Sequence, residues 1–134
     1  MEPKRLLLVD DEPHVTLILS RKLTRAGYEV QIARDGEEGL RIACEFVPDL
    51  VITDLQMPRV DGLTMATNLA EHPTTQDIPV LMLSGRGFLL DTKVAASTRI
   101  IKVLEKPFAA SDIIQSADEI LNISPNQANP GLAA

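Results

Sequence analysis

The sequence predicts an α/β fold in which a five-stranded parallel sheet carries five helices on its two faces. Short, continuous apolar runs alternate along the chain with longer segments whose apolar residues recur at helical spacing. Short apolar runs are typical of strands buried on both faces, and regular alternation of strands with helices favours a parallel sheet. The right-handedness of crossover connections then determines most of the topology.

Two strand–helix units are predicted in the N-terminal third of the chain. Residues 6–9 form an apolar run that ends in acidic residues, and residues 29–33 alternate as a second strand would. The first helix begins at Pro13 and ends before Gly27, because proline suits a first helical turn and glycine a C-terminal end. Asp35 is the predicted N-cap of a second helix. The inward face of that helix carries Leu40, Ala43, Cys44 and Val47.

The third and fourth strands are predicted at residues 49–53 and 79–84, which are largely apolar. Between them, the turn-rich segment 57–62 leads into a third helix at residues 63–70. A fourth helix is placed within residues 86–98, although glycine, serine and threonine lower helix propensity there.

The C-terminal part of the chain supplies a fifth strand at residues 99–104 and a last helix that Ser111 is expected to cap. The inward residues of this helix are Ile113, Ile114, Ala117, Ile120 and Leu121. The residues that follow are mostly small and polar, with two prolines, as is typical of a linker or tail. We therefore expect one folded domain at 1–122, and a flexible tail or linker at 123–134.

The composition argues against several functional classes. The net charge of −6 and the pI of about 4.8 argue against nucleic-acid binding, which needs a basic patch. No apolar run approaches the ~20 residues that span a bilayer, and the N-terminus has no secretory signal pattern. The single cysteine, Cys44, cannot form an internal disulfide, so an intracellular location is expected. We expect Cys44 to be a small, buried apolar residue.

Polar side chains follow the predicted strands at the points where those strands end. Asp10 and Asp11 follow the first strand, Asp54 the third, Ser84 ends the fourth, and Lys106 follows the fifth. Because ligands of such sheets bind at the carboxyl ends of the strands, we expect these side chains to meet in one crevice.

These five side chains suggest phosphoryl transfer to an aspartate. Three neighbouring carboxylates repel one another unless a cation neutralises them, and Mg²⁺ prefers hard oxygen ligands together with water and phosphate. A carboxylate nucleophile, a divalent cation, the amine of Lys106 and the hydroxyl of Ser84 are the groups that such a transfer needs. The metal and the amine would neutralise the charge that develops on the phosphoryl oxygens.

The sequence resembles the receiver domain of bacterial response regulators over residues 4–122. The matching segments are Val9-Asp-Asp-Glu12, Asp54-Leu-Gln-Met-Pro58, Asp61-Gly62, Ser84-Gly85 and Lys106-Pro-Phe108. Each segment alone is a weak signal, but five in order, each at a strand end, form a specific pattern. The resemblance implies a doubly wound, flavodoxin-like sheet with strand order 2-1-3-4-5.

The resemblance also implies a phosphoacceptor and a Mg²⁺ site. Asp54 matches the phosphoacceptor and a metal ligand, and Asp11 matches a direct metal ligand. Asp10 matches the neighbour that holds the metal through water, and the backbone carbonyl of Gln56 matches the third protein ligand.

Ser84 and Lys106 match the residues that hold the phosphoryl oxygens in the active state, and the resemblance implies a cis bond between Lys106 and Pro107. Two features depart from the family pattern. Val103 stands where the family often has an aromatic switch residue, and valine is stiff and has no ring to relocate. An aromatic switch of the usual kind is therefore not expected. A Gly-Ala pair usually precedes the fifth strand in the family, whereas this chain reads Ser97-Thr-Arg-Ile100, so the resemblance does not imply a dimer.

The implied function is a phosphorylation-dependent signalling switch in the cytoplasm. A sensor histidine kinase or a histidine phosphotransfer protein would donate the phosphoryl group to Asp54, and a conformational change would act on an unknown downstream protein. Such a domain promotes its own phosphorylation and dephosphorylation but is not a turnover enzyme. It is expected to bind neither nucleic acid nor membrane, and to be a stand-alone regulator or a receiver cut from a larger protein.

Three alternatives are open. A pseudo-receiver would keep the fold as a protein-binding module without phosphorylation. An aspartate-nucleophile phosphatase would need a second aspartate where Gln56 stands. A flavodoxin-like cofactor carrier would need a loop rich in serine and threonine after the first strand, where this chain is acidic. His14 and His72 are interpreted as solvated surface residues, and Glu12 as solvent-facing.

Overall fold

The computed structural model describes residues 2–85 and 91–121 of the chain, and in these ranges five strands alternate with five helices. The strands are β1 (Arg5–Val9), β2 (Glu29–Ala33), β3 (Leu50–Asp54), β4 (Val80–Ser84) and β5 (Ile100–Glu105). The helices are α1 (Pro13–Arg25), α2 (Gly36–Phe46), α3 (Gly62–Glu71), α4 (Thr92–Ser97) and α5 (Ala110–Leu121). All strand pairs are parallel and the order is β2-β1-β3-β4-β5, which confirms the predicted fold and strand order.

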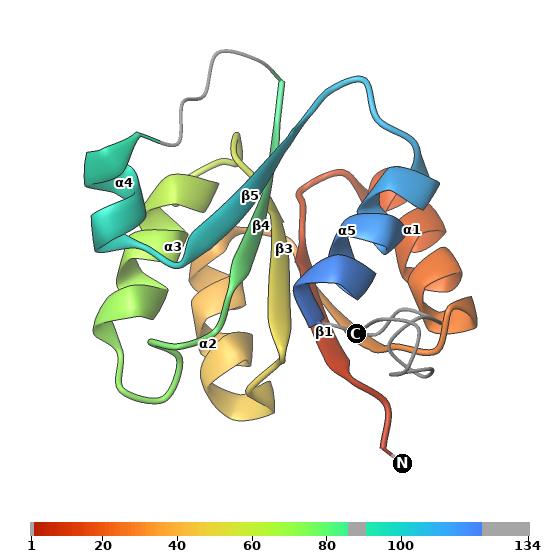
Figure 1. The fold of residues 1–134 in the computed structure, drawn as a ribbon, viewed down its shortest axis with the longest axis horizontal. Coiled ribbons are helices and arrows are strands. Elements are labelled where there is room, and N and C mark those ends of the chain that lie inside the picture. Colours follow the sequence, from red (N-terminus) through yellow and green to blue (C-terminus); the bar gives the residue numbers. More distant parts are fainter. Residues whose placement is uncertain (1, 86–90, 122–134) are drawn as a thin grey trace, which may run out of the picture.

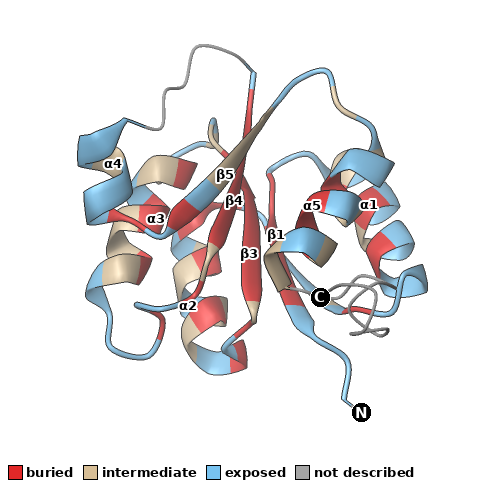
Figure 2. Cartoon of the chain, in the orientation of Figure 1, coloured by how far each residue is buried: buried red, intermediate tan, exposed pale blue. Residues whose placement is uncertain are grey.

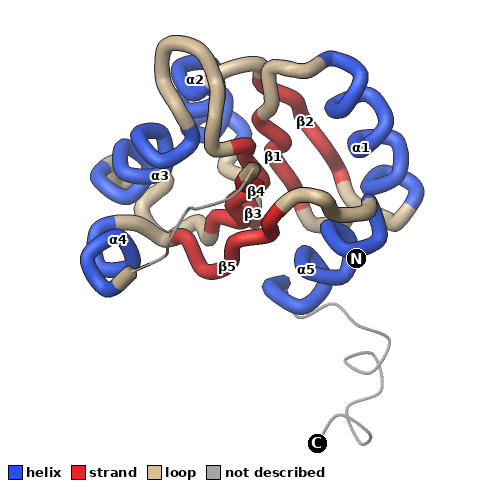
Figure 3. Tube along the Cα trace, turned by 90° about the horizontal axis from the view of Figure 1, so that it is seen from above, coloured by secondary structure: helices blue, strands red, loops and turns tan. Residues whose placement is uncertain are grey.

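The helices form two layers around the sheet. Figures 1 and 3 show α2, α3 and α4 on one face, and α1 and α5 on the other. Because successive side chains of a strand point to opposite faces, β1 contributes Leu7 and Val9 to the core under α2 and α3. It contributes Leu6 and Leu8 to the core under α1 and α5. The buried strands between partly exposed helices in Figure 2 explain why the strands are continuous apolar runs.

Helix α2 confirms one part of its prediction and corrects two others. The carboxylate of Asp35 accepts a hydrogen bond from Glu38 N at 2.8 Å, which is the predicted N-cap. Val47 does not continue the inward face: it is 44% exposed and left-handed (φ 47°), because the helix ends at Phe46. Cys44 is only half-buried, with its Sγ 3.8 Å from Nδ1 of the exposed His72, so the expectation of a buried cysteine was wrong.

The start of α5 also differs from the prediction. The helix begins at Ala110, so Ser111 lies exposed within its first turn and is not the cap. The carboxylate of Asp112 instead accepts a hydrogen bond from Ala109 N at 2.7 Å, as the acidic residue at the third helical position of a capping box does. Of the expected inward residues, Ile113 and Ala117 are fully buried. The others are partly buried against the same core: Ile114, Ile120 and Leu121.

The fourth predicted helix is shorter than expected. Helix α4 covers only Thr92–Ser97, and Asp91 caps it by accepting a hydrogen bond from Val94 N at 2.9 Å. Part of the predicted segment, at 86–90, lies outside the described residues, as does the predicted tail at 123–134. Among the described helices, none combines the length and the apolar character that crossing a bilayer requires.

Candidate functional site

The parallel register brings the ends of four strands to one edge of the sheet. Val9 of β1 pairs with Thr53 of β3, and Asp54 pairs with Leu83 of β4. Ser84 in turn pairs with Glu105 of β5. The residue that follows or ends each strand therefore lies at this edge, as the sequence predicts.

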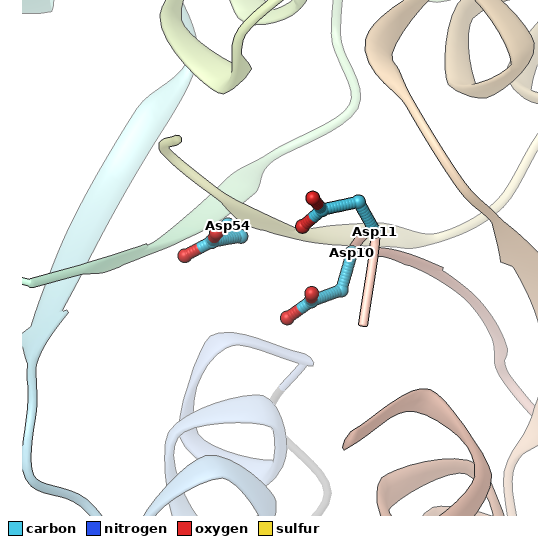
Figure 4. Close-up of side chains that lie close together, drawn as sticks. All are labelled: Asp10, Asp11 and Asp54. Atoms are coloured by element: carbon cyan, nitrogen blue, oxygen red, sulfur yellow. The ribbon is translucent and has the colours of Figure 1, made fainter. Parts of the chain in front are cut away.

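Three carboxylates form a cluster there. Asp10 and Asp11 follow β1 and Asp54 ends β3, and one oxygen of each lies within 4.8 Å of the others. Figure 4 shows the three side chains, with Asp54 across from the adjacent pair. Asp10 and Asp54 are only 5% and 6% exposed, whereas Asp11 is exposed. The cluster is therefore held by the protein on one side and open to water on the other.

Burial makes the inner two carboxylates hard to ionise in the absence of a cation. The pKa of Asp10 is raised to about 6, mainly by burial. A hydrogen bond from Glu12 N at 2.9 Å lowers this pKa, whereas the neighbouring Asp54 and Asp11 carboxylates raise it. Burial is also the main reason that the pKa of Asp54 is raised, and the Lys106 ammonium opposes it. A bound divalent cation would stabilise the ionised forms.

Lys106 and Ser84 complete the surroundings of Asp54. Nζ of Lys106 lies 3.4 Å from Oδ1 of Asp54, and the Lys106–Pro107 bond is cis as the resemblance implies. The Oγ of Ser84 is buried and has no hydrogen-bond partner among the described residues. Because a buried hydroxyl is stabilised by a hydrogen-bond partner, this Oγ is suited to donate to an oxygen of a bound anion.

Gly62 allows the start of α3 to pack against the end of β3. A Cβ at this position would overlap the carbonyl oxygen of Asp54 and lie 3.0 Å from Cα of Leu55. Gly62 N also donates a hydrogen bond to the Leu55 carbonyl at 2.8 Å. The intervening loop carries the exposed Gln56. The glycine of the Asp61-Gly62 motif is thus explained by a close backbone approach.

The donor set fits Mg²⁺. Carboxylate oxygens within reach of one another, on a side open to water, are what a small hard cation that keeps several waters requires. The unpartnered Ser84 hydroxyl and the Lys106 ammonium could then donate hydrogen bonds to an anion bound next to the metal. Two contacts of this region were not predicted from the sequence: the Glu12 N–H bond to Asp10, and an ion pair between Arg59 and Asp35.

Comparison with known proteins agrees with this geometry. The family model of the response regulator receiver domain matches residues 6–118. The chain is 37% identical over 117 residues to the DNA-binding dual master transcriptional regulator RpaA of Synechocystis sp., with 87% of this chain and 48% of that protein covered. It is 36% identical over 112 residues to the response regulator MprA of Mycolicibacterium vanbaalenii, with 84% and 48% covered. The chain thus spans about half the length of these curated relatives.

Solved structures agree as well. A putative response regulator from Chloroflexus aurantiacus superposes with a TM-score of 0.79 at 34% identity, covering 90% of this chain and 98% of that one. The chemotaxis protein CheY4 of Vibrio cholerae gives a TM-score of 0.80 at 26% identity, covering 88% and 98%. With its sheet order, its motifs and these matches, the chain belongs to the response regulator receiver domain family of two-component signalling.

Proposed function

We propose that this receiver domain is a phosphorylation-dependent switch in which Asp54 accepts a phosphoryl group from a phosphohistidine donor. The observation that carries the proposal is the position of the Asp54 carboxylate, which lies between two further carboxylates and the ammonium of Lys106. A carboxylate in these surroundings is suited to act as a nucleophile whose charge and product are both stabilised.

The metal ligands in this proposal are Asp11, Asp54 and the backbone carbonyl of Gln56, with Asp10 acting through water. When bound, Mg²⁺ supplies positive charge that stabilises the transferring phosphoryl group. Ionised Asp10 and Asp11 attract the cation, and the Glu12 N–H bond fixes the Asp10 carboxylate for this purpose.

In the transfer, an Asp54 carboxylate oxygen attacks phosphorus while the bond from phosphorus to the donor imidazole nitrogen breaks. Lys106, already 3.4 Å from this carboxylate, pairs with a phosphoryl oxygen, and Ser84 donates its free hydroxyl to another. The modification adds a charge of about −2, and the movement of these two side chains toward it is the event that changes the surface.

The domain is not a turnover enzyme in this account, because the phosphoryl group passes to and from its own side chain. A pseudo-receiver without phosphorylation is the second candidate. The unpartnered Ser84 hydroxyl favours phosphorylation, since a purely structural domain gains nothing from a buried hydroxyl with no partner among the described residues.

Receiver domains of response regulators act with histidine kinases, and we propose a sensor kinase or a histidine phosphotransfer protein as the donor. The names of the curated relatives describe a DNA-binding regulator and a response regulator, each about twice as long as the matched part. A folded unit at 1–122 with a flexible tail at 123–134, a cytoplasmic location and action on a downstream protein belong to the same proposal.

The test is labelling with acetyl phosphate or a cognate kinase in the presence of Mg²⁺. We expect Asp54→Asn to abolish labelling. The control is Asp77→Asn, which removes an exposed carboxylate and should leave labelling unchanged. Labelling of Asp54→Asn equal to that of the unsubstituted protein would refute the assignment.

A further inference from the structure

The loop between β3 and α3 is tied to the start of α2 by two contacts. Nη2 of Arg59 lies 2.5 Å from Oδ2 of Asp35. Next to this ion pair, Gly36 N donates a hydrogen bond to the Val60 carbonyl at 3.2 Å. A Cβ on Gly36 would lie only 2.5 Å from that carbonyl oxygen, so the two backbones are closely packed. The loop that follows Asp54 is thus anchored to the start of α2 through Arg59, which lies 24 positions after Asp35 in the sequence.

Arg59 is held in an unfavourable backbone conformation. Its φ of 65° is left-handed, which is strained for a residue with a Cβ. Among the non-glycine residues of the described ranges, only Val47 also has a positive φ. The Arg59 side chain is 71% exposed, so packing does not hold it. Its partner is fixed, because the Asp35 side chain is 11% exposed and also caps α2 through Glu38 N. The ion pair is therefore the side-chain contact that supports this backbone.

The surroundings of the ion pair offer a matched control. A cleft of about 440 Å³ beside it is lined by charged residues: Arg34, Asp35, Glu37, Glu38, Arg41 and Arg59. Arg41 belongs to the same cleft, but its ion pairs, 3.8 Å to Glu38 and 3.5 Å to Glu45, stay within α2. Substituting Arg41 removes the same charge from the same cleft without releasing the loop.

We infer that the Arg59–Asp35 ion pair positions the loop after Asp54, and with it the backbone carbonyl of Gln56, for metal binding. The inference rests on the proposed function, because it is the Mg²⁺ ion that gives the loop geometry its consequence. Arg59 does not itself bind the metal and is a positioning residue. Its charge alone predicts the opposite effect, since removing a cation near a divalent metal site strengthens metal binding.

The first measurement is the Mg²⁺ dissociation constant, obtained by titration of the full chain. We expect Arg59→Met to raise it about two- to fivefold, the range that a partly exposed ion pair supports. Asp35→Asn should do the same, because asparagine keeps the N-cap but loses the charge. The double variant should bind Mg²⁺ no more weakly than either single variant, because the two substitutions remove the same contact. Arg41→Met should not weaken binding.

The second measurement is hydrogen exchange of the amides at 55–62 in metal-free protein. Arg59→Met should speed their exchange about two- to fivefold, and Arg41→Met should not. The inference would be overturned if Arg59→Met left amide exchange unchanged. It would also be overturned if Arg59→Met left the Mg²⁺ dissociation constant unchanged or lowered it. The proposed function would stand in either case. Lack of Mg²⁺ binding by the unsubstituted chain would instead overturn the proposed function, and the inference with it.

Discussion

Replacing Asp10 with asparagine should stabilise the metal-free protein at neutral pH. Asp10 is 5% exposed, and burial raises its pKa to about 6 in the folded protein, against an ordinary value of 3.8. The unfolded chain therefore releases this proton more readily, so stability is lost as the pH rises from 3.8 through 6. At a pH above both values the loss is about 3 kcal/mol, at about 1.4 kcal/mol per pH unit. Asparagine avoids this loss and can still accept the hydrogen bond from Glu12 N.

The assay is urea unfolding with a chelator present, at pH 7.5 and at pH 4. The gain from Asp10→Asn should be up to about 3 kcal/mol at pH 7.5 and about 0.5 kcal/mol at pH 4, where Asp10 is largely protonated in the folded state. The control is Asp11→Asn, which removes an exposed carboxylate of the same cluster and should stabilise less. Equal stability of Asp10→Asn and the unsubstituted protein at pH 7.5, or a gain that does not depend on pH, would refute the reasoning.

Three further predictions concern side chains near the site and in the core. Gly62→Ala should lower the free energy of unfolding by about 1–3 kcal/mol, because its Cβ would overlap the Asp54 carbonyl, and should slow labelling. Urea unfolding should show no comparable loss for Gly85→Ala, whose Cβ would have no described atom within 4 Å. Ser84→Ala should change the stability of the unphosphorylated protein by less than about 1 kcal/mol, because its hydroxyl makes no described hydrogen bond. It should nevertheless weaken the response of amide chemical shifts to beryllofluoride; an unchanged response would argue against a role for the hydroxyl. Tyr28→Phe should cost about 1.5–3 kcal/mol in thermal unfolding, since it removes a hydrogen bond to a carboxylate of α5, and an unaltered Tm would contradict this.

The sequence alone predicts most of the fold and the convergence of the site, for two physical reasons. Strands covered on both faces must be continuous apolar runs, so β1, β3 and β4 are visible as such. The carboxyl ends of parallel strands meet at one edge, so the polar residue at each end predicts the cluster of Asp10, Asp11 and Asp54.

What escaped prediction depends on contacts between distant segments or on competition between neighbouring residues. The Arg59–Asp35 ion pair joins residues 24 positions apart, and the sequence indicates only that Asp35 is a helix cap. Ser111 and Asp112 are both plausible at a helix start, and the structure selects the carboxylate as the group that bonds the Ala109 N–H.

The most direct test of the account is to locate the phosphoryl group on the chain. The protein is treated with acetyl phosphate and Mg²⁺, the acyl phosphate is reduced with borohydride to homoserine, and the peptides are mapped by mass spectrometry. The account predicts homoserine at position 54 with Mg²⁺ and none with a chelator. Modification at another residue, or none at all in the presence of Mg²⁺, would contradict it.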